Sequence, residues 1–314
     1  MAPTKVVLAS PRGYCAGVDR AVDTVERALD HFGPPVYVRR EIVHNRHVVA
    51  ELTARGAVFV ESEEDVPARA VLVLSAHGVA PEVHRRSADR ELQVLDATCP
   101  LVTKVHAEAR RFAERGYTIV LVGHAGHEEV VGTMGEAPDA IRLVESIADV
   151  ETLDVPDPLR VAYITQTTLS VDETVEIIAA LRRRYPAAIG PKRDDICYAT
   201  QNRQNAVKRL AAAVDLVLVI GSRNSSNSNR LVEVTRELGV PAHLIDDEGD
   251  IDPAWLEGVE TVGITSGASA PETLVDRVIA HFRAMGVERV EAQHAEPEDV
   301  HFTLPTELRR AVGS

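Results

Sequence analysis

The three cysteines of this chain recur in similar sequence surroundings, and their thiols are the groups best suited to metal binding or nucleophilic chemistry. A polar residue at the end of an apolar segment follows each cysteine after 28 or 29 residues: Cys15 is followed by His44, Cys99 by His127 and Cys197 by Ser225. A further apolar segment then ends in another imidazole or hydroxyl, at His77, Thr167 and Ser269. Long-period self-similarity is typical of repeated structural units. We therefore expect three related units.

The segments around these residues predict alternating strands and helices. Apolar runs such as YTIVLVG and VDLVLVIG, each followed by a helical pattern, are typical of buried parallel strands joined by helices. We predict an α/β fold of three similar domains, at residues 1–97, 98–195 and 196–285. The opening strand KVVLA is a candidate to pair with the third domain. A C-terminal extension, 286–314, contains the strand-like segment VHFTLP.

Composition limits the class of protein. A chain of 314 residues with 45% hydrophobic residues is long enough for two or three domains. The net charge of −14 disfavours nucleic acid and anionic membranes as partners. No apolar run reaches the roughly 18 residues of a membrane span, and the N-terminus lacks a signal-peptide core. We expect a cytoplasmic protein in which an odd number of cysteines favours metal binding or catalysis over a disulfide framework.

Each cysteine precedes an amphipathic helical stretch, and this position favours metal-binding thiolates. The positive end of a helix dipole stabilises a thiolate, and Pro100 after Cys99 suits a first helical position. Three thiols around a pseudo-threefold axis would converge. Zinc normally takes four ligands in a structural site, whereas an iron-sulfur cluster with three protein thiolates leaves one iron open. The cluster is the better fit, although a single cysteine is often a small buried hydrophobic residue.

The polar residues at the strand ends indicate an anion-binding site. They lie in glycine-punctuated loops (AHGV, GHAGHEEVVGTMG, GSRNSSNS and TSGAS) that precede helices and so present backbone N–H groups. Phosphate or diphosphate is the expected ligand. The predicted binding residues are His44, His77, His127, Thr168, Ser225, Ser226, Asn227 and Ser269. The Ser/Asn-rich loop is also consistent with a plain flexible connection.

A carboxyl group accompanies these residues. Glu129, two residues after His127, could hold a proton and donate it beside an anionic ligand. The alternative is a purely structural role, in which this glutamate stabilises a helix N-terminus. Glu128 competes for either role, and the spacing does not separate the two. The segment HEEVV lacks the second histidine of a zinc-protease motif.

Taken together, these segments resemble one enzyme family over nearly the whole chain. The strings PRGYCAGVDRA, EIVHN, SAHGV, DATCPLVTKVH, GHAGHEEVVGTMGE, TQTTLS, DICYATQNRQ, GSRNSSNSNRL and TSGASAPE are similar to those of the 4-hydroxy-3-methylbut-2-enyl diphosphate reductases. The resemblance implies that the three α/β domains form a pseudo-threefold trefoil around an oxygen-sensitive 4Fe-4S cluster. Cys15, Cys99 and Cys197 would hold this cluster and leave one iron open. The resemblance also implies diphosphate binding by the histidines, serines and Asn227 named above. Glu129 and Thr167 would form the proton relay, and we count His127 among the catalytic residues.

The implied reaction is the last step of the non-mevalonate isoprenoid pathway. It is a two-electron, two-proton reductive dehydroxylation of (E)-4-hydroxy-3-methylbut-2-enyl diphosphate that gives isopentenyl and dimethylallyl diphosphates. The resemblance implies a ferredoxin or flavodoxin as the electron donor. The sequence contains no G-x-G-x-x-G nucleotide motif. Two other classes stay open: a cluster-bearing electron carrier or redox sensor, and a zinc-stabilised sugar-phosphate or nucleotide-binding protein.

Overall fold

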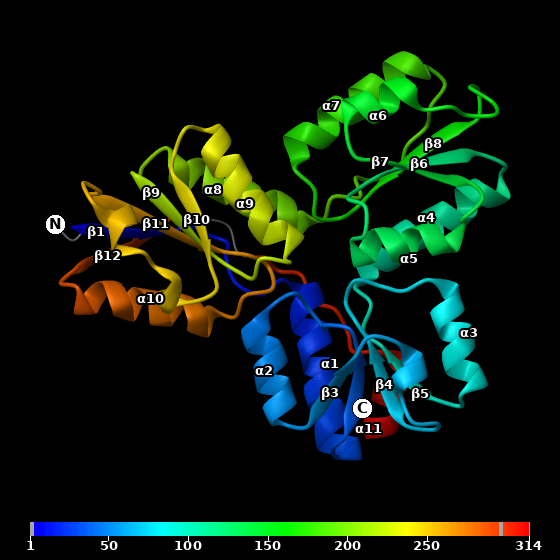
Figure 1. Ribbon diagram of the computed structural model, residues 1–314, viewed down its shortest axis with the longest axis horizontal. Helices are drawn as coiled ribbons and strands as arrows, with labels where there is room; N and C mark the ends of the chain where they lie inside the picture. The colour runs from blue at the N-terminus through cyan, green and yellow to red at the C-terminus, as the bar shows by residue number, and fades with distance from the viewer. Residues whose placement is uncertain (1–2, 295–297, 314) are drawn as a thin grey trace. The chain divides into compact units, whose positions relative to one another are not determined.

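The computed structural model describes residues 3–294 and 298–313 and shows an α/β protein whose paired strands all run parallel (Figure 1). Its described strands form three separate sheets. The predicted α/β class with three parallel sheets is therefore confirmed.

The described part of the chain forms two compact units. Unit 1 takes its residues from Met1–Val18, His44–Ala50 and Tyr198–His301, and unit 2 from Asp19–Val43, Glu51–Cys197 and Phe302–Ser314. Unit 1 contains one five-stranded sheet of order β10-β9-β11-β1-β12. Its strands are β1 (Lys5–Leu8), β9 (Leu216–Ile220), β10 (Ala242–Ile245), β11 (Thr261–Ser266) and β12 (Arg289–Ala292).

Unit 2 contains two smaller sheets, of orders β3-β2-β4-β5 and β7-β6-β8. The first sheet comprises β2 (Val36–Arg39), β3 (Ala57–Val60), β4 (Val71–Leu74) and β5 (Gln93–Asp96). The second comprises β6 (Thr118–Val122), β7 (Ile141–Val144) and β8 (Val161–Thr165).

The same three-strand arrangement occurs in each sheet. In each, a first strand lies in the middle, the next strand along the chain lies on one side of it, and the third lies on the other. We call these sets trio 1 (β2, β3, β4), trio 2 (β6, β7, β8) and trio 3 (β9, β10, β11). Trio 3 is extended by β1, which pairs with β11 and β12. The spacing of the cysteines thus reflects a repeated α/β topology.

Helices connect the strands. They are α1 (Ala16–Phe32), α2 (Arg46–Ala54), α3 (Pro81–Asp89), α4 (Pro100–Glu114), α5 (Glu128–Glu136), α6 (Ile147–Thr152), α7 (Val171–Arg184), α8 (Tyr198–Ala211), α9 (Ser226–Glu237), α10 (Glu272–Ala284) and α11 (Thr306–Val312), with short 3-10 turns at Glu63–Asp65, Glu248–Asp250 and Pro253–Leu256. The VHFTLP segment is not a strand: residues 301–305 have no regular structure, and Pro305 caps α11. Proline has no N–H group to donate to a neighbouring strand, and it is common at helix starts. This explains why the segment leads into α11 instead of forming the predicted strand.

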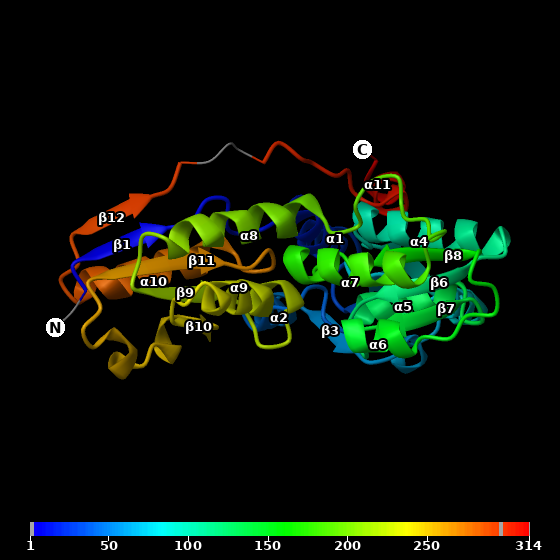
Figure 2. The ribbon, with the colours of Figure 1, turned by 90° about the horizontal axis from the view of Figure 1, so that it is seen from above.

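Successive side chains of a strand point to opposite faces of the sheet, and in unit 1 helices pack against both faces. On β9, Leu216, Leu218 and Ile220 pack into the core that contains α10, whereas Val217 and Val219 pack into the core that contains α8 and α9. Figure 1 shows α10 on one side of the sheet and the other two helices on the opposite side. Figure 2 shows α8 and α9, which contact each other, running along the sheet.

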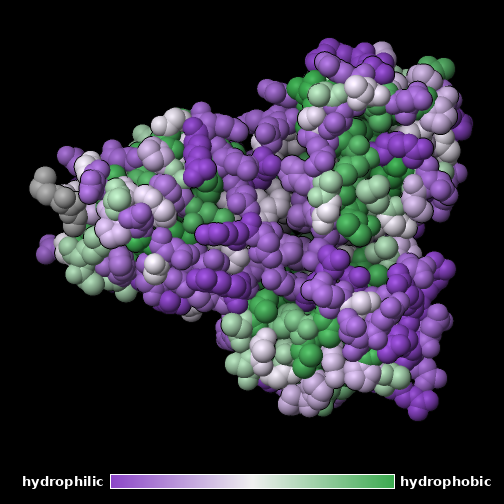
Figure 3. Space-filling view, in the orientation of Figure 1, coloured by the Kyte–Doolittle hydropathy of each residue, from purple (hydrophilic) through white to green (hydrophobic). Residues whose placement is uncertain are grey.

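Much of the outer surface is polar. In the view of Figure 3, hydrophilic residues cover large areas and hydrophobic residues gather in smaller ones. Within the described residues, no helix has both the length and the hydropathy needed to cross a membrane.

A buried charged cluster in unit 2 fixes the loop that leads to Cys197. Lys104 Nζ of α4 donates to the carbonyl oxygens of Arg193 (2.8 Å) and Asp194 (3.0 Å) and to Asp195 Oδ1 (2.9 Å). Asp195 Oδ2 accepts the backbone N–H of Thr165 at the end of β8 (3.0 Å). Burial, together with the neighbouring Asp195, raises the pKa of Glu108 to about 7.

Core packing in unit 1 leads to a first prediction. Leu218 is fully buried, so Leu218→Ala should destabilise the protein by about 2–5 kcal/mol through lost apolar contacts and a cavity. Leu238→Ala, at a site 51% exposed in the same unit, is the matched control and should cost less than about 0.5 kcal/mol. Urea denaturation followed by circular dichroism measures both. Equal effects would show that the Leu218 position is not a packed core.

The raised pKa of Glu108 predicts a pH-dependent stability. The folded protein keeps this proton up to about pH 7, while the unfolded chain releases it near the ordinary glutamate value, so stability falls as pH rises between the two. Glu108→Gln removes this loss. The stability of the variant relative to wild type, measured by urea midpoints, should therefore be higher at pH 8 than at pH 5. Glu114→Gln, exposed on the same helix, is the control. A Glu108→Gln difference that does not change with pH would contradict the prediction.

Candidate functional site

Each of the three cysteines lies immediately before a helix. The residue after Cys15 begins α1, the residue after Cys99 begins α4, and the residue after Cys197 begins α8. All three side chains are partly buried and none forms a disulfide. The expected placement of the thiols at helix N-termini is therefore present at all three positions.

A backbone hydrogen bond links each cysteine to the loop after the third strand of a trio. The N–H groups of Cys15, Cys99 and Cys197 donate to the carbonyl oxygens of Ala268 (3.2 Å), Ala76 (3.0 Å) and Thr167 (3.1 Å), respectively. These loops follow β11, β4 and β8, and they carry the polar residues Ser269, His77 and Thr167. The structure therefore places each cysteine beside one of the strand-end residues that the repeat singled out.

In unit 1, the turn before Cys15 is fixed by residues that sequence reasoning missed. Gly13 has φ +76°, in the left-handed region that favours glycine, and its N–H donates to Ser266 Oγ (2.8 Å). Arg203 is 1% exposed and donates from its guanidinium to the Gly13 carbonyl oxygen (2.7 Å). Arg203 falls on the apolar stripe of α8 with Ala199, Ala206 and Val207, and an arginine in that stripe was the available sequence signal.

The polar residues of unit 1 form a connected group around Ser225, which is buried. Ser225 Oγ lies 3.4 Å from Ser269 Oγ and accepts a hydrogen bond from Asn227 Nδ2 (2.9 Å). Ser269 Oγ donates to the carbonyl oxygen of His44 (3.0 Å). The His44 ring nitrogen Nδ1 lies 3.3 Å from Asn224 Nδ2. Four predicted binding residues are thus brought together at the start of α9.

Two glycines allow this group to form. A Cβ atom at Gly221, after β9, or at Gly267, after β11, would overlap Ser228 Oγ. Ser228 is fully buried and donates to Ser225 Oγ (2.9 Å). Both glycines therefore permit close approach of the strand ends to the first turn of α9, where backbone N–H groups point outward. Ser226 is the first residue of that helix.

In unit 2, Glu129 and Thr167 form a buried pair, each 5% exposed. Glu129 Oε2 accepts the backbone N–H of Thr167 (2.9 Å), and the Thr167 hydroxyl lies 3.0 Å from both carboxylate oxygens. His127 caps α5, with its Nδ1 accepting the Glu129 N–H at 3.2 Å. The three predicted catalytic residues therefore lie together.

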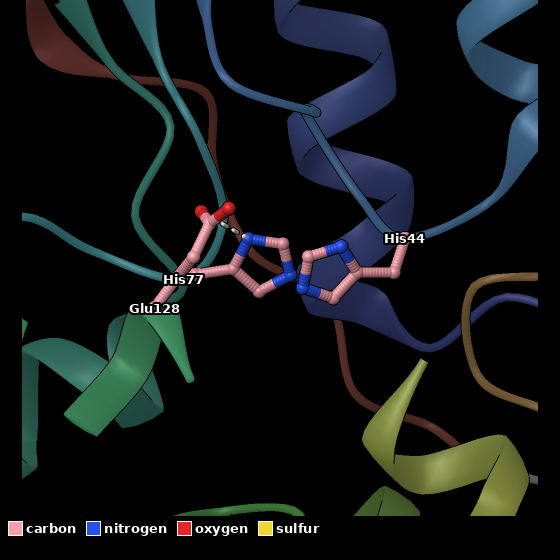
Figure 4. Close-up of side chains that lie close together, drawn as sticks. All are labelled: His44, His77 and Glu128. Carbon is pink, nitrogen blue, oxygen red and sulfur yellow. Dashed lines mark ion pairs between the residues drawn. The ribbon is translucent and has the colours of Figure 1, made fainter. Parts of the chain in front are cut away.

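The neighbouring Glu128 has different partners. Its Oε2 lies 3.3 Å from His77 Nδ1, the ion pair drawn in Figure 4, and 3.5 Å from Ser75 Oγ. Arg40 lies 3.5 Å from the other carboxylate oxygen. The His77 and His127 rings are arranged edge to face with centroids 6.1 Å apart. The structure thus separates the two glutamates: Glu129 contacts Thr167, and Glu128 contacts His77.

Thr168 is held by a side chain that sequence reasoning did not identify. Gln166, 2% exposed, donates from Nε2 to Thr168 Oγ1 (2.8 Å) and accepts the His124 N–H at Oε1 (3.1 Å). Gln166 therefore ties the loop after β8 to the loop after β6.

The chemistry available differs between the units. Unit 1 offers hydroxyl, amide and imidazole groups at a helix N-terminus, a setting that suits phosphate oxygens. Unit 2 offers two histidines and a buried carboxyl–hydroxyl pair, which can orient a hydroxyl group and transfer a proton. The cysteines supply three thiols, the donor type that binds iron-sulfur clusters.

Comparison with known proteins places these features in a family. The family model described as "LytB protein" matches residues 6–283. A relative from Acidothermus cellulolyticus, named 4-hydroxy-3-methylbut-2-enyl diphosphate reductase, is 62% identical over 98% of this chain and 90% of its own length. A relative of the same name from Mycolicibacterium paratuberculosis is 61% identical over 98% of this chain and 93% of its own.

A solved structure is also similar over nearly the whole chain. The E-1-hydroxy-2-methyl-but-2-enyl-4-diphosphate reductase from Plasmodium falciparum matches with a TM-score of 0.94 and 36% identity, covering 99% of this chain and 98% of its own. With the family model spanning most of the sequence and relatives near 60% identity, this chain belongs to the LytB protein family.

Proposed function

We propose that this protein is a reductase that removes the hydroxyl group from (E)-4-hydroxy-3-methylbut-2-enyl diphosphate, giving isopentenyl and dimethylallyl diphosphates. The names of its relatives support the substrate. The observation that carries the mechanism is the buried Glu129–Thr167 pair, with the hydroxyl 3.0 Å from the carboxylate. Loss of a hydroxyl as water requires a group that orients the hydroxyl and a group that delivers a proton, and this pair contains both.

The polar residues of unit 1 would bind the diphosphate. Ser225, Asn227, Ser269 and His44 already share hydrogen bonds, so their donors are fixed before ligand arrives. Ser226 adds the N-terminal turn of α9, whose dipole favours an anion. Fixed neutral donors bind anions without the side-chain entropy cost of a long lysine or arginine.

The residues of unit 2 would act on the reacting end and on phosphate oxygens. Thr167 would orient the substrate hydroxyl, and Glu129 would hold and deliver the proton. His77 and His127 would donate to phosphate oxygens, with His77 held by Glu128 and the His127 ring held against the Glu129 N–H. Thr168, fixed by Gln166, would contact the substrate beside Thr167.

Cys15, Cys99 and Cys197 would hold a 4Fe-4S cluster. Three thiols at helix starts, each with its backbone amide fixed by a hydrogen bond, fit this donor set. When bound, such a cluster with one iron free of protein ligands supplies electrons and a Lewis acid. The electrons would come from a ferredoxin or flavodoxin in the cytoplasm.

Glu129→Gln tests the proton path. The amide keeps the size of the side chain but cannot deliver the proton, so kcat should fall by about 100-fold or more with little change in KM. The measurement is anaerobic turnover of the hydroxylated allylic diphosphate with a reduced dye. Unchanged turnover would remove Glu129 from the proton path.

Glu128→Gln is the matched neighbour. Because Glu128 contacts His77 rather than Thr167, its amide variant should raise the KM for the diphosphate substrate about threefold to tenfold and change kcat much less. A kcat loss as large as that of Glu129→Gln would mean that the two glutamates share one role.

Metal analysis tests the cofactor. Protein purified anaerobically should contain iron and acid-labile sulfide in similar amounts, and replacement of any one cysteine by alanine should lower both. Stoichiometric zinc without sulfide would instead favour a zinc-stabilised binding protein.

A further inference from the structure

The end of α7 and the loop after it carry a run of basic residues without an acidic one. It comprises Arg182, Arg183, Arg184, Lys192 and Arg193, and all five side chains are exposed. The chain as a whole has a net charge of −14. This run, which we call the basic loop, therefore places five positive charges within residues 182–193 of an acidic protein.

The charge of the basic loop is not neutralised within the part of the chain that the structure describes. Arg182 donates to Tyr163 Oη (2.6 Å), and Arg184 donates to the carbonyl oxygens of Glu151 (2.6 Å) and Leu153 (2.9 Å). These contacts hold two guanidinium groups in place without a carboxylate partner. None of the five cations forms an ion pair with another described residue, so their field is available to an external group.

Hydrogen bonds fix the segment between the basic loop and Cys197, a proposed cluster ligand. Lys104 holds the carbonyl oxygens of Arg193 and Asp194, and Asp195 is bound to both Lys104 and the end of β8. Cys197 follows Arg193 by four residues. A protein that docks on the basic loop would therefore rest on a fixed segment leading directly to that cysteine.

We propose that the basic loop is the docking surface for a small acidic electron-transfer protein. The inference rests on the proposed reductase function, which needs two electrons from outside because the chain has no nucleotide-cofactor motif of the G-x-G-x-x-G type. Each encounter oxidises the donor by one electron. Two electrons cleave the C–O bond of the substrate; one proton leaves with the hydroxyl as water, and the other forms a C–H bond on the allylic group. Complementary charge speeds such encounters and sets orientation. Nucleic acid and anionic membranes are disfavoured because they are extended polyanions, which would meet the rest of a chain of net charge −14 as well as the basic loop, whereas a small acidic protein can contact the loop alone.

Charge reversal of the loop tests this. The double variant Lys192→Glu/Arg193→Glu changes two exposed side chains that have no polar partner in the described residues. We expect the KM for reduced ferredoxin, an acidic one-electron donor, to rise about tenfold or more at low salt, and the difference from wild type to shrink as ionic strength increases. Turnover with reduced propyl viologen sulfonate, a small dye whose reduced form carries a single negative charge, should stay within twofold of wild type, because so small a charge gives the loop little to attract.

The matched control is Arg142→Glu/Arg283→Glu, which changes net charge equally at exposed positions elsewhere. It should raise the ferredoxin KM less than threefold. Equal KM increases in both double variants would overturn the proposal, because they would reflect net charge alone. An unchanged ferredoxin KM in the loop variant would also overturn the proposal. If, in addition, the wild type binds anionic vesicles or polynucleotide and the loop variant does not, the basic loop serves that partner instead. Failure of the wild type to turn over with the dye would instead reject the proposed function itself.

Discussion

The arrangement of this protein depends on one backbone hydrogen bond that is made three times. Each cysteine donates its N–H to the loop after the third strand of a trio, at 3.0–3.2 Å. That bond fixes the first residue before a helix, so it sets both the direction of the helix and the position of the thiol. Because the accepting loops also carry Ser269, His77 and Thr167, the same interaction places a potential metal ligand next to a potential substrate contact in every repeat.

Helix geometry explains why two adjacent glutamates have different partners. Consecutive residues of an α-helix point about 100° apart. At the start of α5, this turns Glu128 toward His77, Ser75 and Arg40, and Glu129 toward Thr167. One carboxylate is therefore suited to supporting an imidazole, and the other to holding a proton beside a hydroxyl. The His127 cap makes the division possible because it fixes the helix start.

Rigid positioning comes from residues with no chemical role of their own. Arg203 connects α8 to the turn before Cys15, Lys104 connects α4 to the loop before Cys197, and Gln166 connects the loops after β6 and β8. Gly221 and Gly267 act through the absence of a side chain, since any Cβ would displace Ser228. A site built from short neutral side chains has little reach, so its precision must come from such neighbours.

The sequence by itself determined the α/β class, the repeat, the position of each cysteine before a helix and most of the polar residues that gather at strand ends. These follow from local patterns: apolar runs make buried parallel strands, and strand ends in such sheets share one edge. Residue spacing did not distinguish Glu128 from Glu129, and only the family resemblance pointed to Glu129. Arg203 and Gln166 were missed. Only the tertiary structure decided these points, because the partners lie far apart in the chain: Thr167 is 38 residues from Glu129, and Gly13 is 190 residues from Arg203. Side-chain partners at that separation are set by how strands and helices pack, which no local pattern encodes.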